Sequence, residues 1–373
     1  MKRYICISAA ALLLSSCSAP EGMKVYVDAP GMVELDADSV LSSLKAQYVV
    51  VTDAAGDTLA SQITSDGKLI FMPADVPAEY TLCASDHAVA YDTIAYGRIY
   101  PERLDDLCWE NDVVGFRAYG PGTQRGGDRL YGYDLFLKRD TVRPIIPYLI
   151  ANDHDPAKWR VVDSLRAAGR DAAADSLINS FSYHVDHGYG MDCYAVGPTL
   201  GACTSALAPA DSIVYPWCYT RAQILDNGPL RFTARLTFAP VAVGTDTVTE
   251  ERVITLDAGS NLNKTEVRFR GATQAYPVVT GIVLHDAGAS AYHSPKERCI
   301  LYQDPTQGAD NGELYIGAVF PQGPDSTAIR HGHVLAYSTL APDSIYTYYW
   351  GFGWNRGNMS DLSAWKNYLK NQK

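Results

Sequence analysis

Segment 181–203 holds the side chains of this chain that are best suited to chemistry. It combines His184, His187, Asp186 and Asp192 with three tyrosines and several glycines. Imidazole and phenol groups transfer protons and hold metals or sugar hydroxyls, while glycine lets the backbone approach other groups closely. A segment so rich in polar residues and glycine is not a packing element. We therefore expect a functional site here.

His184 and His187 are three residues apart, and this spacing alone does not decide their role. They would share a face on a helix but point to opposite faces on a strand. The neighbouring glycines favour a loop, where both can converge. Three roles stay open: proton transfer or substrate contact, a divalent metal site (Zn or Ca), and hydrogen bonds that order the loop. A metal would take His285, or His331 and His333, as further ligands, because catalytic zinc needs three.

Arginines gather in a short span of a chain whose net charge is −11. They are Arg98, Arg103, Arg117, Arg125 and Arg129. Arginine binds carboxylates in a bidentate manner, so a local basic pocket would suit an acidic glycan. Acidic residues are interleaved with these arginines, and internal salt bridges are the competing interpretation.

Acidic residues near both segments could supply the carboxyl pair of a glycoside hydrolase. The separation between such groups sets the stereochemical outcome, and a sequence does not give that separation. Loops rich in aspartate and asparagine can also bind calcium through oxygen ligands. The candidate acids are Asp105, Asp106, Glu110, Asp112, Asp128, Asp134, Asp186 and Asp192.

The 25 tyrosines and several tryptophans point to sugar recognition, because aromatic faces stack on sugar rings and their polar tips bond hydroxyl groups. Many of the tyrosines are also ordinary strand residues. The residues that we expect to contact substrate are Tyr183, Trp109, Glu110, Arg103, Arg125, His285, His333 and Trp354.

The N-terminus resembles an export signal. Lys2 and Arg3 precede a short apolar run, and Cys17 stands where a bacterial lipoprotein carries its acylated cysteine. We predict a signal peptide over 1–16 and a lipidated linker over 17–22. The alternative is a plain secretory signal with a coincidental cysteine. The expected location is the outer membrane, held by the lipid and facing the periplasm or the cell surface.

The net charge and the cysteine spacing bear on nucleic-acid binding, on zinc binding and on disulfide bonds. The net negative charge argues against general nucleic-acid binding. The six later cysteines form no CxxC pair, which excludes a zinc ribbon. Exported proteins tolerate disulfides, so free thiols and one or two bridges both fit. Cys193 with Cys203 is the first pairing to test.

Short alternating runs separated by turn residues predict a mostly β protein. Residues 23–95 read as a small N-terminal β-sandwich module. Residues 96–373 read as a large antiparallel two-sheet sandwich, because strands predominate and no βαβ alternation occurs. One helical insert is predicted over 157–180, and a short helix over 361–369 closes the chain.

Several longer motifs carry a family resemblance. They include Tyr96-Gly-Arg98, Trp109-Glu-Asn-Asp112, Tyr119-Gly-Pro121, Gly190-Met-Asp-Cys-Tyr194, Gly197-Pro-Thr-Leu-Gly201, Asp226-Asn-Gly-Pro229 and Gly351-Phe-Gly-Trp354. With these motifs the chain, from about residue 25 to 370, resembles domain of unknown function family 4861. The resemblance implies an exported Bacteroidetes protein associated with polysaccharide breakdown. It also implies a supersandwich similar to that of galactose mutarotases and several polysaccharide lyases, and it supplies no mechanism.

Together these features favour a carbohydrate-active enzyme that cleaves a uronate-containing oligosaccharide by β-elimination. The reaction needs a group that neutralises the carboxylate, a base and an acid. Arg98 or Arg117 would neutralise, and His184 or His187 would be the base. Tyr194 or Tyr183 would be the acid, and Asp192 belongs to the same catalytic set. A glycoside hydrolase with an Asp/Glu pair and a non-catalytic glycan-binding lipoprotein are the alternatives.

Overall fold

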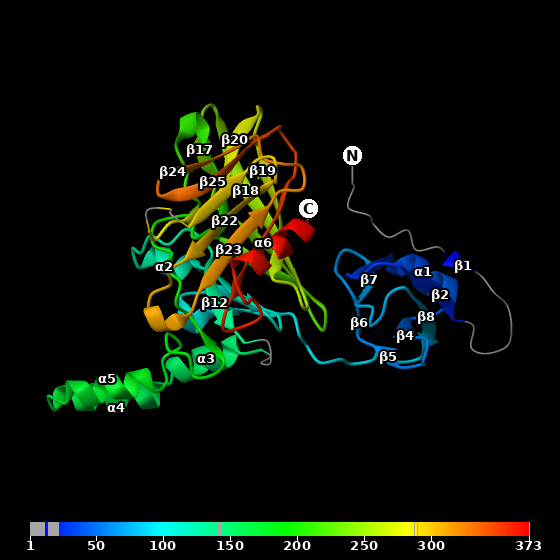
Figure 1. The fold of residues 1–373 in the computed structure, drawn as a ribbon, viewed down its shortest axis with the longest axis horizontal. Coiled ribbons are helices and arrows are strands. Elements are labelled where there is room, and N and C mark those ends of the chain that lie inside the picture. The colour runs from blue at the N-terminus through cyan, green and yellow to red at the C-terminus, as the bar shows by residue number, and fades with distance from the viewer. Residues whose placement is uncertain (1–11, 14–21, 140–143, 287, 289, 373) are drawn as a thin grey trace. The chain divides into compact units, whose positions relative to one another are not determined.

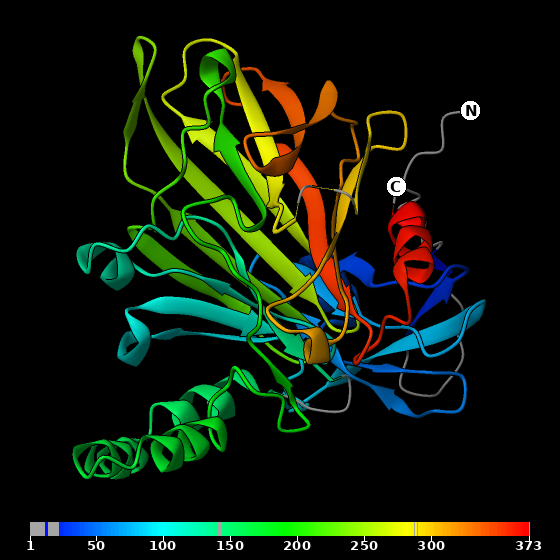
Figure 2. The ribbon, with the colours of Figure 1, turned by 60° about the vertical axis from the view of Figure 1, so that its left-hand side comes forward.

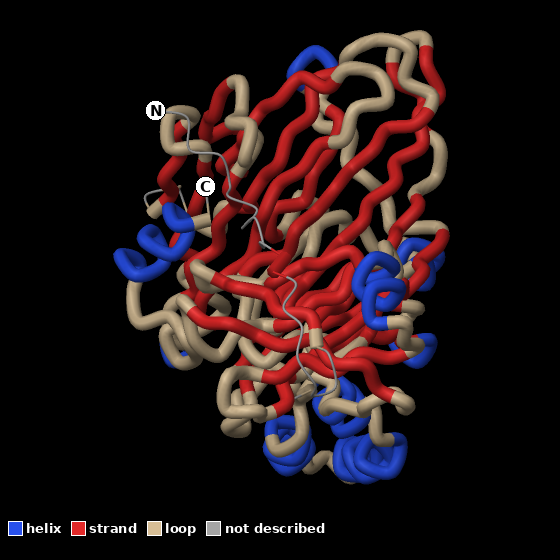
Figure 3. Tube along the Cα trace, turned by 90° about the vertical axis from the view of Figure 1, so that its right-hand side faces the viewer, coloured by secondary structure: helices blue, strands red, loops and turns tan. Residues whose placement is uncertain are grey.

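The computed structural model describes residues 12–13, 22–139, 144–286, 288 and 290–372. Cys17 and most of the predicted signal peptide lie outside these residues. The chain divides into two compact units, which are described separately. Unit 1 comprises Met1–Tyr96 with Leu225–Thr233, and unit 2 comprises Gly97–Ile224 with Ala234–Lys373. Strands, drawn red in Figure 3, are more abundant than helices in the described chain. The prediction of a mostly β fold built from antiparallel sheets is confirmed.

Unit 1 consists of two small sheets and one helix. The five-stranded sheet has the order β1-β2-β8-β4-β5, and the three-stranded sheet has the order β3-β7-β6. The elements are β1 (Leu12–Leu13), β2 (Met23–Val27), β3 (Val33–Asp36), α1 (Ala37–Leu44), β4 (Tyr48–Thr52), β5 (Thr58–Leu59), β6 (Ser61–Ile63), β7 (Lys68–Phe71) and β8 (Ala78–Ser85). Helix α1 is not among the sequence-based predictions.

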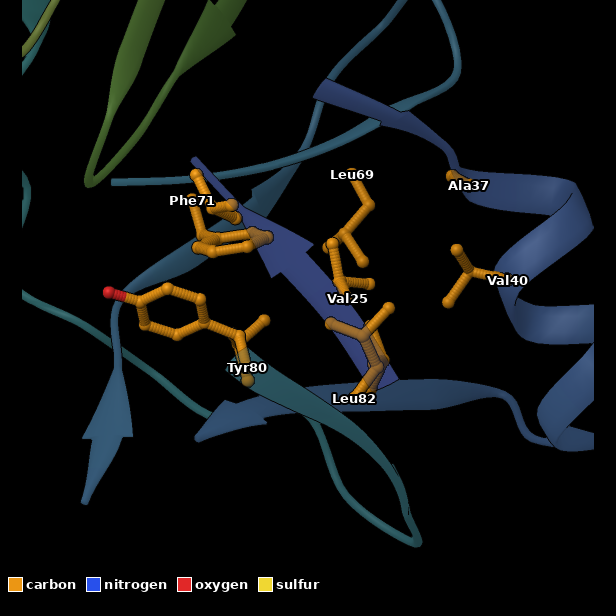
Figure 4. Packing of buried hydrophobic residues seen from close by; sticks show 10 residues of the cluster. Val25, Ala37, Val40, Leu69, Phe71, Tyr80 and Leu82 are labelled. Carbon is orange, nitrogen blue, oxygen red and sulfur yellow. The ribbon is translucent and has the colours of Figure 1, made fainter. Parts of the chain in front are cut away.

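The core of unit 1 forms because alternate strand residues face inward. Val25 and Leu82 lie on paired strands and pack with Leu69 (Figure 4). Val40 of α1 belongs to the same core, which is why this short amphipathic helix is stable here. Its N-terminus is capped by the Asp36 carboxylate, which accepts a hydrogen bond from the Ser39 N–H at 2.8 Å.

Unit 2 contains three antiparallel sheets, apart from Tyr96 and the residues of Leu225–Thr233, which are assigned to unit 1. Their orders are β13-β12-β11-β10-β9, β14-β20-β25-β24, and β15-β16-β18-β19-β26-β23-β22-β21 with β17 paired to β18. The strands are β9 (Tyr96–Tyr100), β10 (Asp106–Glu110), β11 (Gly115–Ala118), β12 (Asp134–Lys138), β13 (Gly190–Met191), β14 (Ala202–Leu207), β15 (Arg221–Asn227), β16 (Arg231–Thr237), β17 (Val241–Val243), β18 (Asp246–Asp257), β19 (Leu262–Arg270), β20 (Tyr276–Val283), β21 (Ala291–Ser294), β22 (Cys299–Asp304), β23 (Leu314–Val319), β24 (Ser326–Arg330), β25 (His333–Leu340) and β26 (Tyr346–Trp354).

The helices of unit 2 are short, and the predicted insert is not one continuous helix. They are η1 (Pro101–Arg103), α2 (Pro121–Arg125), α3 (Ile146–Asp153), α4 (Pro156–Ala167), α5 (Asp171–Asn179), η2 (Pro209–Asp211), η3 (Ala309–Asn311) and α6 (Leu362–Asn371). Gly169 adopts φ +71°, which ends α4 and turns the chain into α5. The two helices form a hairpin that extends from the rest of unit 2 (Figures 1 and 2). None of the helices in the described part of the chain is long and apolar enough to cross a membrane.

Candidate functional site

Five charged side chains meet in the five-stranded sheet of unit 2, and we call them the charge cluster. They are Arg103, Asp106, Arg117, Asp134 and Asp192. Arg103 ends η1, Asp106 begins β10, Arg117 lies on β11, Asp134 begins β12, and Asp192 follows β13. Arg117 is directly opposite Asp134 in the ladder, so their side chains share one face of the sheet. Sheet register therefore brings these residues together.

The distances in the charge cluster show that the carboxylates share the guanidinium groups. Arg117 Nη2 lies 2.7 Å from Asp134, and its Nη1 lies 3.5 Å from Asp192. Asp106 lies 3.3 Å from Arg103 Nε and 3.7 Å from Arg117 Nε. Arg103 Nη2 also lies 3.7 Å from Asp192. The arrangement agrees with the competing interpretation of internal salt bridges, and all five side chains are buried.

Burial changes the protonation of the charge cluster. Burial, with help from neighbouring carboxylates, raises the pKa of Asp106 to about 7 against the hydrogen bond from the Gly120 N–H. Burial and the Asp134 charge likewise raise the pKa of Asp192 to about 7. Because two guanidinium groups face three carboxylates, one proton makes the cluster neutral. The cluster therefore holds and releases protons near neutral pH.

A strained turn fixes one side of the charge cluster. Leu104 and Asp105 adopt φ of +56° and +64°, which non-glycine residues rarely do. The backbone of Gly120 lies so close to this turn that any Cβ there would overlap the Asp105 carbonyl group. The Gly120 N–H donates to Asp106 at 2.7 Å. The Tyr119-Gly-Pro121 motif thus contains a glycine that the site geometry requires.

Buried Tyr183 and exposed His184 lie beside the charge cluster. The Arg103 guanidinium lies 4.4 Å from the centre of the Tyr183 ring, and the Tyr183 and His184 rings are 4.5 Å apart. The Nδ1 atom of exposed His184 lies 2.8 Å from the Asp192 carbonyl oxygen. Its Nε2 atom has no hydrogen-bond partner among the described residues. With a proton on Nδ1, Nε2 is a free acceptor at the surface.

His187 lies in the same loop but is held differently. Its Nε2 atom lies 3.2 Å from the Ser182 carbonyl oxygen. Asp186 orders the loop, because it accepts hydrogen bonds from Gly188 N–H at 2.8 Å and from Arg139 at 2.7 Å. Within the described residues there is no group of three or more His, Cys, Asp or Glu that could hold a metal ion. The predicted set His184, His187 and His285 is thus not assembled.

Two predicted substrate-binding histidines use both of their ring nitrogens inside the protein. His285 contacts Asp304 at 2.5 Å through Nδ1 and the Ala195 carbonyl oxygen at 2.7 Å through Nε2. Buried His333 contacts the His331 carbonyl oxygen at 2.6 Å and accepts from the Leu200 N–H at 3.1 Å. Neither side chain has a nitrogen left for substrate. The prediction that they bind substrate through these nitrogens fails, because backbone groups and the Asp304 carboxylate already occupy them.

Four further predicted residues lie in the core, with exposed fractions of 0 to 4%, below the 8% of Tyr183 and the 9% of Arg103. Trp109 packs 5.5 Å from Phe116 and donates to Asn263, and Trp354 donates to the Asn311 carbonyl group. Glu110 pairs with Lys138 and accepts from two backbone N–H groups at the start of α3. The buried Tyr194 hydroxyl has no hydrogen-bond partner in the described structure. These assignments fail because the strands place the side chains in the core.

The remaining predictions separate by exposure. Arg98 and Arg125 lie at the surface and pair with Glu102 and Asp105, each at 2.8 Å, so they stand outside the charge cluster. The six cysteines of the described region are free, and the Cys193–Cys203 bridge is absent.

Tyr119 is a member of the site that is not among the sequence-based predictions, and its hydroxyl donates a hydrogen bond to Asp134 at 2.8 Å. Its place in the Tyr119-Gly-Pro121 motif was the available signal.

Comparison with known proteins places the chain in a sequence family. The model of the domain of unknown function family DUF4861 matches residues 30–373. "Uncharacterized protein P7" from Formosa agariphila is 27% identical over 321 residues, which cover 81% of this chain and 74% of that protein.

The similar solved structures share little sequence with this chain. An alpha-mannosidase from Enterococcus faecalis V583 has a TM-score of 0.44 and 9% identity, over 97% of this chain and 43% of that chain. A glycosyl hydrolase family 38 protein from Enterococcus faecalis has a TM-score of 0.45 and 8% identity, over 93% and 45%. A putative kojibiose phosphorylase from human microbiome has a TM-score of 0.30 and 10% identity, over 38% and 20%. The chain spans less than half the length of each of these structures.

Proposed function

We propose that this chain, which belongs to the domain of unknown function family DUF4861, is a carbohydrate-active enzyme that cleaves a uronate-containing glycan by β-elimination. The observation that carries the proposal is the meeting of three groups at one edge of the charge cluster. They are the free Nε2 atom of His184, the Tyr183 phenol and the Arg103 guanidinium. The reaction needs a base, an acid and a positive charge together.

In the proposed reaction, His184 Nε2 removes the proton from C5 of the uronate. The C–H electron pair forms a double bond between C4 and C5, and the bond from C4 to the glycosidic oxygen breaks. The Tyr183 hydroxyl donates its proton to that oxygen. The hydroxyl makes no hydrogen bond with a described residue, so it is available to a substrate. Transfer of the C5 proton from His184 to Tyr183 restores both groups.

The charge cluster suits this reaction because binding one proton changes its net charge from −1 to zero. Two arginines and three ionised carboxylates would leave one negative charge and repel a uronate. The pKa values of about 7 for Asp106 and Asp192 allow one proton to remain bound near neutral pH. The cluster is then neutral and does not repel the uronate, and the Arg103 guanidinium beside Tyr183 is placed to donate hydrogen bonds to the substrate carboxylate.

Glycoside hydrolysis is the second candidate, and the same pKa values favour it. A protonated carboxyl group and an ionised one next to a shared arginine resemble the acid and the nucleophile or base of a glycosidase. Asp106 and Asp192 are only 2% and 4% exposed, whereas Tyr183 and Arg103 are 8% and 9% exposed and His184 lies at the surface. Accessibility therefore favours elimination.

The test is a panel of uronate polymers: alginate, polygalacturonate, hyaluronan and glucuronoxylan. We expect ultraviolet absorbance from the new double bond with at least one polymer, with loss of this product in His184→Ala. His187→Ala, a matched change in the same loop, should retain activity. New reducing ends without absorbance would instead support hydrolysis. Binding without either product would leave a glycan-binding lipoprotein.

We also propose export and acylation at Cys17, because the sequence before it resembles a lipoprotein signal. A palmitate analogue fed to expressing cells should label the full chain and should not label Cys17→Ser. Equal labelling of both proteins would refute acylation at this residue.

A further inference from the structure

One exposed aromatic side chain, Trp217, and two half-buried ones, Tyr131 and Tyr215, form a group on unit 2, which we call the aromatic platform. The rings of Tyr131 and Tyr215 are stacked with centroids 5.4 Å apart, and Tyr131 lies 6.1 Å from Trp217. Trp217 is 48% exposed, whereas Trp109, Trp350, Trp354 and Trp365 are buried. Its indole N–H makes no hydrogen bond with a described residue. The platform therefore presents an open ring face and a free donor.

Packing of the hydrophobic core does not explain why the Trp217 side chain is exposed. A large aromatic side chain left in water forgoes most of the free energy that burial would provide. The Tyr131 ring contacts both the Tyr215 ring and the Trp217 ring, so Trp217 is supported by a neighbouring aromatic side chain. Pro216 lies between Tyr215 and Trp217 and restricts the backbone between them. A rigid, exposed aromatic surface is typical of a site that binds a ring-shaped ligand.

Two hollows are lined in part by Trp217, and one of them includes a side chain that contacts the charge cluster. One is apolar and is lined by Leu207, Val214 and Phe238 among others. The other is lined by both Tyr119 and Tyr131 as well as by Trp217. Tyr119 donates to Asp134, and the Arg117 guanidinium lies 4.3 Å from the centre of its ring. Tyr119 of the second hollow thus contacts two members of the charge cluster, Asp134 and Arg117.

We propose that the aromatic platform is a subsite that binds sugar units of the same acidic glycan beyond the cleavage point. A sugar ring would stack on Trp217 through its C–H face, and the indole N–H would donate to a ring hydroxyl. Arg129 is exposed, makes no ion pair with a described residue and directly precedes Leu130 of the second hollow. It supplies positive charge near the path of a uronate chain. The inference rests on the proposed function, because it takes its ligand from that reaction.

The test compares short and long uronate oligosaccharides on protein that carries His184→Ala, so that the probe is not consumed. Disaccharides and hexasaccharides of galacturonate and of alginate are titrated by calorimetry. We expect Trp217→Ala to weaken hexasaccharide binding about tenfold, which corresponds to about 1.4 kcal/mol, and to leave disaccharide binding nearly unchanged. Trp217→Phe keeps an aromatic face and should restore most of the affinity. Tyr26→Ala is the control, because Tyr26 is 51% exposed but lies in unit 1.

The outcomes separate the platform from the reaction. If hexasaccharide binding is the same in Trp217→Ala as in the parent, or if the parent binds no probe, the platform proposal is wrong. If the wild-type protein forms no product but binding depends on Trp217 and on chain length, the platform stands and the elimination reaction fails. If Tyr26→Ala weakens binding as much as Trp217→Ala does, the effect does not belong to the platform.

Discussion

The loop that carries His184 resembles in sequence the two segments that carry His285 and His333. The three histidines differ in how their ring nitrogens are hydrogen-bonded. Each segment places a histidine close to glycines. His184 is exposed and uses one ring nitrogen, whereas His285 and His333 use both. A histidine can transfer a proton to a ligand only through a nitrogen that is free and reachable. Residue type therefore suggested the chemistry, and hydrogen bonding decides which histidine can perform it.

The largest effect is expected from His184→Ala. We predict a loss of about 10² to 10⁴ in turnover on the polymer that the enzyme cleaves, because the proposed base is removed. The melting temperature should change little, since the side chain is exposed and makes one hydrogen bond to the protein. Rate assays and thermal unfolding are measured on the same preparations. Full activity in His184→Ala would show that His184 is not the base of the reaction.

His333→Ala should show the opposite pattern, with a loss of stability. The change leaves the Leu200 N–H and the His331 carbonyl group without their partner. Each buried group left unpaired costs about 1–3 kcal/mol, and denaturant unfolding measures the total. His331→Ala is the matched control, because the His331 side chain is exposed and only its backbone makes the contact. Equal stability of the two variants would argue against a structural role for His333.

The charge cluster should make stability depend on pH. The pKa values of Asp106 and Asp192 are raised in the folded state to about 7 from 3.8. Their contribution is full below the unfolded pKa and is lost as the pH rises through about 7. We therefore expect the free energy of unfolding, measured with denaturant at each pH, to fall between pH 5 and pH 8, with a slope of at most about 1.4 kcal/mol per pH unit for each group. Asp192→Asn should flatten the profile, and an unchanged slope would contradict the assignment.

The smallest effect concerns His285. Burial alone would lower its pKa, but the hydrogen bond and charge of Asp304 raise it above the usual 6.5. The protonated pair therefore stabilises the folded state below pH 6.5, and this contribution is lost as the pH rises through the folded pKa. Asp304→Asn should reduce the difference in melting temperature between pH 6 and pH 8. A difference equal to that of the wild type would show that the pair does not titrate in this range.

The elements were more predictable than the site. Alternation of apolar residues predicted most strands, and the closing helix appears as α6 with Asp361 as its cap. The hydrophobic face of the insert predicted helix, but the turn at Gly169 was not recognised. The sequence predicts Trp109 and Glu110 as substrate contacts, because an aromatic and an acidic residue stand side by side in one motif. Residues from distant parts of the chain bury Trp109 and Glu110 in the folded protein. The local sequence around the two residues does not contain these neighbours.

The sequence by itself determined the β class, the acidic charge and the residue types available for chemistry, because these depend on composition and on local periodicity. The site was decided only by tertiary structure. Arg117 and Asp192 are far apart along the chain and meet because strands β11, β12 and β13 are adjacent in one sheet. Protonation of the carboxyl groups follows from their burial, and the availability of His184 follows from a single backbone contact. Both properties arise from packing between distant segments, which no local pattern specifies.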